Sequence, residues 1–121
     1  MSKAKSILVV EDDPDVRGAL VAFLEGEGYS VVEATHGAEA LEHLREPRQF
    51  CLILLDLMMP VMNGWEFREQ QQKDPALADI PVLVVTADTT AVRRAADVGA
   101  VGCLLKPVEF PELLAYVGRY C

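Results

Sequence analysis

The sequence predicts an α/β domain in which helices cover both faces of an open, parallel β-sheet. Strand-like runs alternate with helix-like segments five times along the 121 residues. Such alternation favours parallel strands joined by right-handed crossovers. Four of the runs are almost wholly apolar, which is typical of strands buried on both faces. The length suits one domain with a substantial core.

The strands are predicted from these runs in chain order. They are expected at residues 7–10, 30–34, 51–55, 82–85 and 101–105. The second run is the weakest, because polar residues interrupt its apolar ones. Each of the other four is nearly continuous in valine, leucine and isoleucine, the composition that a buried parallel strand favours.

The first two helices are predicted from their start and stop signals. The first begins at Pro14, after Asp13 as its N-cap, and ends near Gly26. The second carries apolar residues at helical spacing and stops before Pro47.

The remaining helices differ in the strength of their apolar faces. The helix after Gly64 is weak, because residues 68–73 are wholly polar. The helix after Asp88 is rich in alanine and ends at Gly99, so we expect a shallow, loosely held element. The last helix has the clearest spacing, with apolar residues at Phe110, Leu113, Leu114 and Val117.

Polar residues follow four of the five runs, where parallel strands end at one edge of the sheet. They are Glu11, Asp12 and Asp13 after the first run, Asp56 after the third, Thr86 and Asp88 after the fourth, and Lys106 after the fifth. Ligands of open α/β sheets bind at this edge. Each residue alone has an ordinary explanation as a turn or capping residue. The prediction of a site therefore depends on their joint placement.

The converging carboxylates predict a cation site. Two like charges ~4 Å apart, at an effective dielectric near 20, cost on the order of 4 kcal/mol, so a cation or an ammonium group is needed among them. An all-oxygen ligand set favours Mg²⁺ or Mn²⁺ over zinc. A carboxylate beside such an ion can attack a phosphodonor, and Lys106 and Thr86 can contact the transferred oxygens.

Four segments in fixed order carry a family resemblance: ILVVEDDP (7–14), LILLDLMMPVMNG (52–64), VVTAD (84–88) and GAVGCLLKP (99–107). Through them the chain resembles, over essentially its whole length, the receiver (phosphoacceptor) domain of two-component response regulators. The resemblance implies a flavodoxin-like (βα)5 fold, with strand order 2-1-3-4-5 and five flanking helices. It also implies a cis peptide bond between Lys106 and Pro107.

The resemblance implies a role for each site residue. Asp56 is expected to be the phosphoacceptor, converted to 4-aspartylphosphate. Thr86 and Lys106 are expected to contact the phosphoryl group. The implied metal ligands are Asp12, Asp13, Asp56 and the backbone carbonyl of Met58.

The resemblance also implies a two-state switch, from which this chain departs at one position. In the family, the residue corresponding to Thr86 moves toward the added oxygens, and an aromatic residue three positions before the lysine rotates inward. Here that position is Cys103, which is too small to fill the space of an aromatic ring. The signal then travels through the loop after Thr86 or through another surface. Asn63 replaces the usual aspartate before the glycine, and we expect little effect because both residues cap helices.

The implied partners are a sensor histidine kinase or a histidine phosphotransfer protein, and an output partner that the sequence does not identify. A phosphorylation-dependent dimer through the alanine-rich helix, the last strand and the last helix is also implied. No output domain follows the last helix, so a single-domain regulator and an excised receiver both stay open. The only catalysis expected is the domain's own Mg²⁺-dependent phosphorylation and dephosphorylation. The alternative is a phosphorylation-independent pseudo-receiver that acts as an interaction module.

Charge and composition exclude several other classes. The net charge is −8, whereas proteins that bind nucleic acids or anionic membranes usually present a basic surface. No signal peptide or membrane-length apolar run is visible. The three cysteines, Cys51, Cys103 and Cys121, form no C-x-x-C pair. We therefore expect reduced thiols in a cytoplasmic protein.

Three enzyme or carrier families of similar architecture fit less well. A haloacid-dehalogenase-like phosphatase needs a second aspartate two residues after the first, where this chain has Met58. A flavin carrier needs a phosphate-binding loop where the chain has Glu11, Asp12 and Asp13. A pyridine-nucleotide enzyme needs G-x-G-x-x-G there, which is absent. We interpret His36 and His43 as surface residues, and not as metal ligands.

Overall fold

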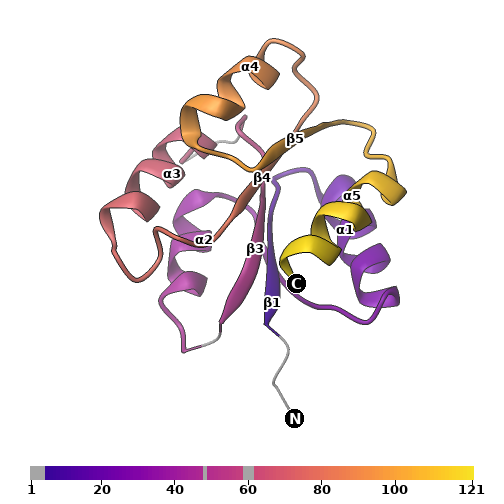
Figure 1. Cartoon of the computed structure of the whole chain (residues 1–121), viewed down its shortest axis with the longest axis horizontal. Helices are drawn as coiled ribbons and strands as arrows, with labels where there is room; N and C mark the ends of the chain where they lie inside the picture. The colour runs from indigo at the N-terminus through magenta and orange to yellow at the C-terminus, as the bar shows by residue number, and fades with distance from the viewer. Residues whose placement is uncertain (1–4, 48, 59–61) are drawn as a thin grey trace.

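The computed structural model describes residues 5–47, 49–58 and 62–121. Within them, five strands form one parallel sheet of order β2-β1-β3-β4-β5. Helices lie on both sides of this sheet (Figure 1). The predicted class and strand order are therefore confirmed. The strands are β1 (Ser6–Val10), β2 (Ser30–Ala34), β3 (Phe50–Leu55), β4 (Val82–Thr86) and β5 (Gly102–Leu105).

The helices follow the strands in strict alternation. They are α1 (Pro14–Gly26), α2 (Gly37–Leu44), α3 (Gly64–Lys73), α4 (Ala91–Ala95) with a 3-10 turn (Ala96–Val98), and α5 (Phe110–Tyr120). Helices α1 and α5 cover one face of the sheet, and α2, α3 and α4 cover the other (Figure 1). The peptide bond before Pro107 is cis, as the resemblance implied. None of the described helices is long and apolar enough to cross a membrane.

The three central strands are buried at every position, as their continuous apolar runs predict. Alternate residues supply two separate cores. In β1, Leu8 and Val10 pack on the side of α2, α3 and α4, whereas Ile7 and Val9 pack on the side of α1 and α5. The edge strands β2 and β5 are only partly buried. Val101 lies just outside β5, although it was predicted to begin that strand.

Two helices begin where side chains satisfy their first backbone amides. The Asp13 carboxylate accepts from the amides of Asp15 at 2.9 Å and Val16 at 3.3 Å, and so caps α1. Asn63 and Glu66 form a reciprocal capping box at the start of α3. The capping role expected of Asn63 is confirmed.

The polar run of α3 is partly buried, which its sequence did not indicate. Arg68 donates from Nε to the Val98 carbonyl at 2.6 Å and from Nη1 to Oε1 of Gln71 at 2.9 Å. Gln71 is fully buried and donates from Nε2 to the carbonyls of Leu77 and Ile80, at 2.8 and 3.1 Å. These bonds tie α3 to the 3-10 turn and to the loop before β4.

The alanine-rich helix is short, as its shallow apolar face predicts. Its 3-10 extension ends at Gly99, whose φ of 70° lies in the left-handed region that favours glycine. The guanidinium of Arg94 lies 4.8 Å from the ring centroid of Trp65. This cation–π contact adds a second tie between α4 and α3.

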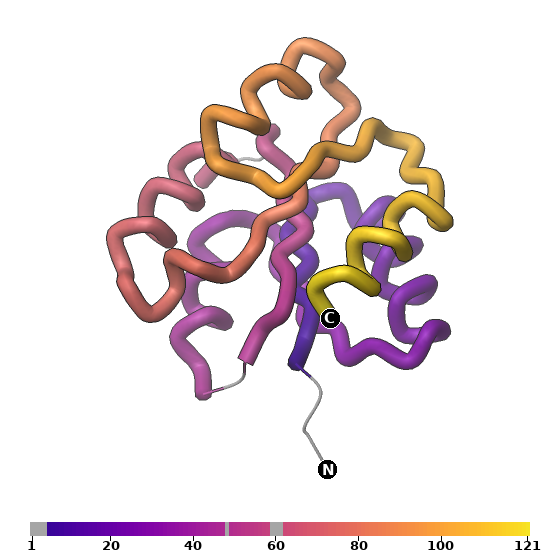
Figure 2. Tube along the Cα trace, in the orientation of Figure 1, coloured from indigo at the N-terminus to yellow at the C-terminus, as the bar shows by residue number. Residues whose placement is uncertain are grey.

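The cysteines differ from the prediction. Cys51 and Cys121 form a disulfide across 70 positions of sequence, with their Cα atoms 5.4 Å apart. Only Cys103 is free. The expectation of three reduced thiols is therefore wrong for two of them. The reason is topological, because the fold places the end of α5 beside the start of β3 (Figure 2). No local pattern in the sequence predicts this long-range contact.

Candidate functional site

The predicted polar residues lie at the carboxyl edge of the sheet. Glu11 follows β1, Asp56 follows β3, Thr86 ends β4 and Lys106 follows β5. The strand order reverses at the β1–β3 pair, which is the switch point where open α/β sheets bind ligands. The parallel register thus brings together residues that are far apart in sequence.

Lys106 joins two of the acidic residues. Its Nζ atom lies 2.6 Å from Oε1 of Glu11 and 3.2 Å from Oδ2 of Asp56. The contact with Glu11 is a short ion pair. Glu11 is 2% exposed and Asp56 is 5% exposed. The ammonium group is therefore the counter-charge of two buried carboxylates.

The carboxylate of Asp56 is held in position by the backbone around it. Its own amide donates to the Val10 carbonyl at 3.1 Å, which extends the β1–β3 pairing by one residue. Its Oδ1 atom accepts from the amide of Met58 at 3.0 Å. Gly64 packs so closely that an added Cβ would lie 2.6 Å from Cδ2 of Leu57. The two hydrogen bonds therefore fix the Asp56 backbone and one of its carboxylate oxygens at the end of β3.

The environment changes the acid–base properties of two of these groups. Burial raises the pKa of Glu11 to about 7; the charge of Asp56 adds to this rise and the contacts with Lys106 oppose it. Burial alone would lower the pKa of Lys106, but its contacts with Glu11 and Asp56 outweigh burial and raise that pKa. Lys106 is thus an ammonium group over the whole neutral range.

Glu11, Asp12 and Asp56 form a cluster that can hold a metal ion. One carboxylate oxygen from each residue lies within 4.8 Å of the others. Asp12 is exposed, whereas the other two are buried, so an ion would sit between the solvent and the Asp56 carboxylate. Lys106 neutralises only one of these three charges. The all-oxygen set fits Mg²⁺ or Mn²⁺.

The structure brings together an acidic set that differs from the predicted one. Asp13 was predicted as a metal ligand beside Asp12, but its Oδ1 atom caps α1, and the clustered carboxylates are those of Glu11, Asp12 and Asp56. Glu11 takes its place, because the Glu11 amide donates to the Ala34 carbonyl at 3.0 Å and continues the strand pairing. The Asp13–Pro14 pair was a visible N-cap signal in the sequence, and it would have separated the capping residue from the ligands.

The other predicted residues lie around this cluster. Thr86 is 1% exposed, and its Oγ1 atom accepts from the Asp88 amide at 3.1 Å. The amide of Lys106 donates to the Thr86 carbonyl at 2.9 Å, which holds the ends of β4 and β5 together. Met58 is 55% exposed and contacts Asp56 through its amide.

Cys103 lies in β5 opposite Val84, half-buried against the core beneath α2, α3 and α4. Burial raises the pKa of its thiol. The position expected to hold an aromatic switch residue is thus occupied by a small, partly covered side chain.

Comparisons with known proteins agree with this geometry. The family model described as response regulator receiver domain matches residues 7–118. The response regulator MprA of Mycobacterium leprae is 42% identical over 113 residues, which are 92% of this chain and 48% of that protein. The CpxR homologue of Haemophilus influenzae, a transcriptional regulatory protein, is 37% identical, with the same coverage. The chain thus spans about half the length of these curated relatives.

Solved structures share the fold over nearly the whole chain. A response regulator receiver protein from Pseudomonas putida has a TM-score of 0.89 at 28% identity, covering 98% of this chain and 99% of that one. The chemotaxis protein CheY4 of Vibrio cholerae has a TM-score of 0.87 at 31% identity, covering 98% and 100%. From the family match, the shared strand order and the acidic site at the carboxyl edge, the chain belongs to the receiver domains of two-component response regulators.

Proposed function

We propose that this receiver domain accepts a phosphoryl group on Asp56, in a reaction that depends on a divalent cation. The donor is the phosphohistidine of a sensor histidine kinase or of a histidine phosphotransfer protein. One observation carries the proposal: the buried Asp56 carboxylate contacts the Lys106 ammonium and also belongs to the acidic cluster that can hold a cation. Phosphoryl transfer needs mainly positioning and charge neutralisation, and this arrangement supplies both.

The chain's own groups have distinct roles in the transfer. A carboxylate oxygen of Asp56 attacks phosphorus, the bond from phosphorus to the donor breaks, and the leaving group takes the electron pair. Lys106 is already 3.2 Å from Asp56, so it can pair with the phosphoryl oxygens of the 4-aspartylphosphate product. The hydroxyl of Thr86, which now accepts from Asp88, is free to donate its proton to one of those oxygens.

Glu11, Asp12 and Asp56 would hold the cation, with the Met58 carbonyl as a further ligand. A bound Mg²⁺ or Mn²⁺ supplies charge neutralisation for the phosphoryl oxygens. Asp13 is left out of this set, because its Oδ1 atom caps α1 and its carboxylate is not one of the three that cluster. The cation and the ammonium together balance a site that is otherwise strongly negative.

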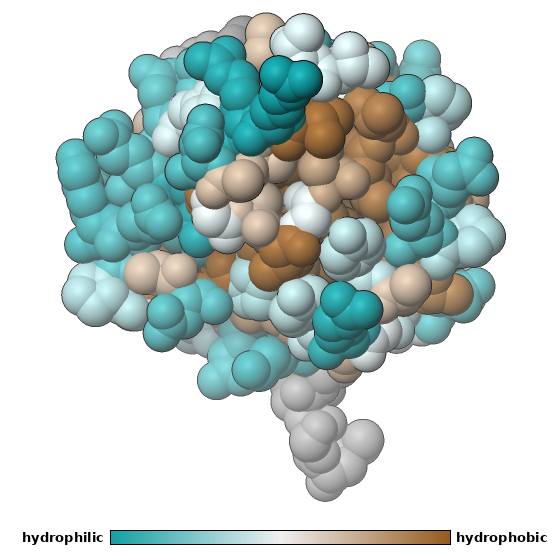
Figure 3. Space-filling view, turned by 45° about the horizontal axis from the view of Figure 1, so that its top comes forward, coloured by the Kyte–Doolittle hydropathy of each residue, from teal (hydrophilic) through white to brown (hydrophobic). Residues whose placement is uncertain are grey.

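The signalling partners follow from the same proposal. The domain would work in the cytoplasm and pass its state to an output partner through a protein surface. Exposed apolar side chains lie on α4 at Val92, just before β5 at Val101 and at the end of β5 at Leu105. Figure 3 turns this end of the molecule forward and shows apolar surface gathered among hydrophilic side chains. A phosphorylation-dependent dimer through α4, β5 and α5 would use this surface.

Phosphorylation is tested by incubating the chain with acetyl phosphate and Mg²⁺ and measuring its intact mass. The expected result is the addition of one phosphoryl group, which is lost when EDTA is present or when Asp56→Asn is introduced. Asp13→Asn is the matched control, because asparagine also caps helices, and it should be phosphorylated like the wild type. A folded wild-type protein of unchanged mass would refute the proposal and favour the pseudo-receiver alternative.

A further inference from the structure

We propose that Cys51 and Cys121 form a reversible redox site that exchanges with low-molecular-weight thiols and so latches or releases the end of α5. The disulfide joins the second residue of β3 to the residue that follows α5. It lies at the opposite end of β3 from Asp56 (Figure 1). The proposal is therefore independent of the phosphoryl chemistry.

The two cysteine residues differ in their exposure to solvent. Cys51 is 6% exposed, whereas Cys121 is an exposed residue. An attacking thiolate can therefore reach the sulfur of Cys121 more easily than that of Cys51. Access decides which sulfur of a disulfide is attacked, so the structure predicts the order of the exchange steps.

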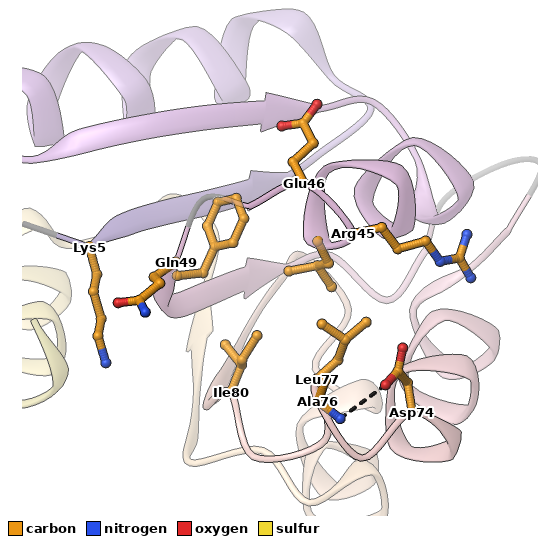
Figure 4. Close-up of a pocket in the computed structure, with 10 residues that line it drawn as sticks. Lys5, Arg45, Glu46, Gln49, Asp74, Ala76, Leu77 and Ile80 are labelled. Carbon is orange, nitrogen blue, oxygen red and sulfur yellow. Dashed lines mark hydrogen bonds between the residues drawn. The ribbon is translucent and has the colours of Figure 1, made fainter.

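Open space lies beside the disulfide. A cavity of about 320 Å³ is lined by Cys51, Tyr120 and Lys5, among others. A second cavity of about 480 Å³, which shares Lys5 and Ile80 with the first, adjoins it below the start of β3 (Figure 4). These hollows have room for a small thiol, and the one beside Cys51 carries charges of both signs, from Lys5 and Asp79.

The exchange balances as two thiol–disulfide steps. In the first, an external thiolate bonds to Sγ of Cys121, and Cys51 leaves as a thiolate that takes up a proton. In the second, another external thiolate attacks the external sulfur of this mixed disulfide, and Cys121 leaves. The protein gains two thiols and the external pair becomes a disulfide. The reverse sequence, with a low-molecular-weight disulfide as oxidant, closes the latch.

The fold accommodates the reduced state as well as the oxidised one. Sγ of Cys51 lies 3.5 Å from the carbonyl oxygen of Ser6, so the freed thiol has an acceptor within the sheet. Leu113 and Val117 of α5 are fully buried, so apolar packing holds this helix in addition to the disulfide. Reduction of the disulfide therefore releases the last turn of α5 from β3, while the rest of the helix keeps its packing. A reversible disulfide also suits a reducing compartment, where lasting ones are rare.

The first test counts thiols in buffers that range from oxidised to reduced glutathione. After an acid quench, the protein is blocked with N-ethylmaleimide in denaturant and its mass is measured. One label, on Cys103, is expected at the oxidised end and three at the reduced end, because the chain has three cysteines. One label throughout would show a bond that does not exchange, and three throughout would show that none forms. Either result overturns the proposal.

The second test examines which sulfur reacts. In Cys51→Ser, oxidised glutathione should form a stable adduct on Cys121. In Cys121→Ser, the buried Cys51 should react slower by on the order of tenfold. Equal rates, or a faster Cys51, would contradict the proposed order. Serine retains a donor for the Ser6 carbonyl, so folding of the first variant is favoured.

The third test measures the latch itself. Reduction should lower the melting temperature of the wild type by roughly 10 °C, since a loop of this length constrains the unfolded chain strongly. Cys103→Ser, the matched control, should show the same loss, and Cys121→Ser should show none between the two buffers. Asp56→Asn should behave like the wild type, which separates this inference from the proposed function. A wild-type melting temperature that is the same in the oxidising and the reducing buffer would refute the latch.

Discussion

The raised pKa of Glu11 predicts that the metal-free protein loses stability as the pH rises toward neutrality. Glu11 has a pKa of about 7 in the folded protein, whereas its ordinary pKa, which applies to the unfolded chain, is 4.5. Between these values the folded state binds more protons, so the stabilising contribution is complete below 4.5 and is lost as the pH rises through 7. The difference sets a ceiling of about 3 kcal/mol.

The measured effect should be smaller than this ceiling, because the charge of Lys106 lies in direct contact with Glu11 and favours its ionised form. We expect a loss of about 1 to 3 kcal/mol in the free energy of unfolding between pH 5 and pH 8. Urea unfolding in EDTA, followed by circular dichroism, measures it. Glu11→Gln is the matched control, because its amide can still accept from the Asp13 amide but cannot titrate.

The comparison between wild type and Glu11→Gln isolates this one group, because every other titration is shared by both proteins. The wild type should lose more stability than the variant as the pH rises. Millimolar Mg²⁺ should restore the stability of the wild type at pH 8, because the cation takes the place of the proton. Equal pH profiles for the two proteins, or a wild type that gains stability relative to the variant, would refute the reasoning.

Three further predictions test the metal ligands, the counter-charge of the buried carboxylates and the buried hydrogen bonds of α3. Asp12→Asn should abolish the rise in melting temperature that Mg²⁺ produces. Asp13→Ala should lower the free energy of unfolding by about 1 kcal/mol and leave that rise intact. Thermal melts with and without Mg²⁺ distinguish the two variants, and equal effects would contradict the two roles. Lys106→Met should destabilise the metal-free protein by about 3 kcal/mol at pH 8, because two buried carboxylates lose their counter-charge; urea unfolding measures this loss, and an unchanged midpoint would exclude it. Gln71→Leu should lower the free energy of unfolding by about 2 to 3 kcal/mol, because two carbonyls and Arg68 lose their hydrogen-bond partner. Gln70→Ala, at an exposed position of the same helix, is the control. Equal unfolding free energies for the two variants would show that the buried hydrogen bonds contribute nothing.

Much of the fold could be predicted from local pattern. The continuous apolar runs of β1, β3 and β4 require cover on both faces, and alternation with helices makes a parallel sheet the natural solution. The order of the strands came from the family resemblance. The burial of Gln71 could not be predicted, because it depends on carbonyls of a loop whose path only the packed structure defines.

The site was predictable as a place but not in its detailed membership. Because parallel strands end at one edge, Asp56 and Lys106 were expected together although 50 positions separate them. Composition alone does not choose between Glu11 and Asp13 in a run of three acidic residues, although the Asp13–Pro14 pair marked Asp13 as the capping residue. The turn into α1 made that choice, since it directs one carboxylate to the helix amides and leaves the other in the site.

The sequence by itself therefore determined the architecture, the family and the location of the acidic site, because all three follow from periodicity and from motifs that are local in the chain. Only the tertiary structure decided which carboxylates share Lys106, how α3 is tied to its neighbours, and that Cys51 meets Cys121. These are contacts through space between distant segments. Their existence depends on where helices end against the sheet, and the one-dimensional pattern does not contain that information.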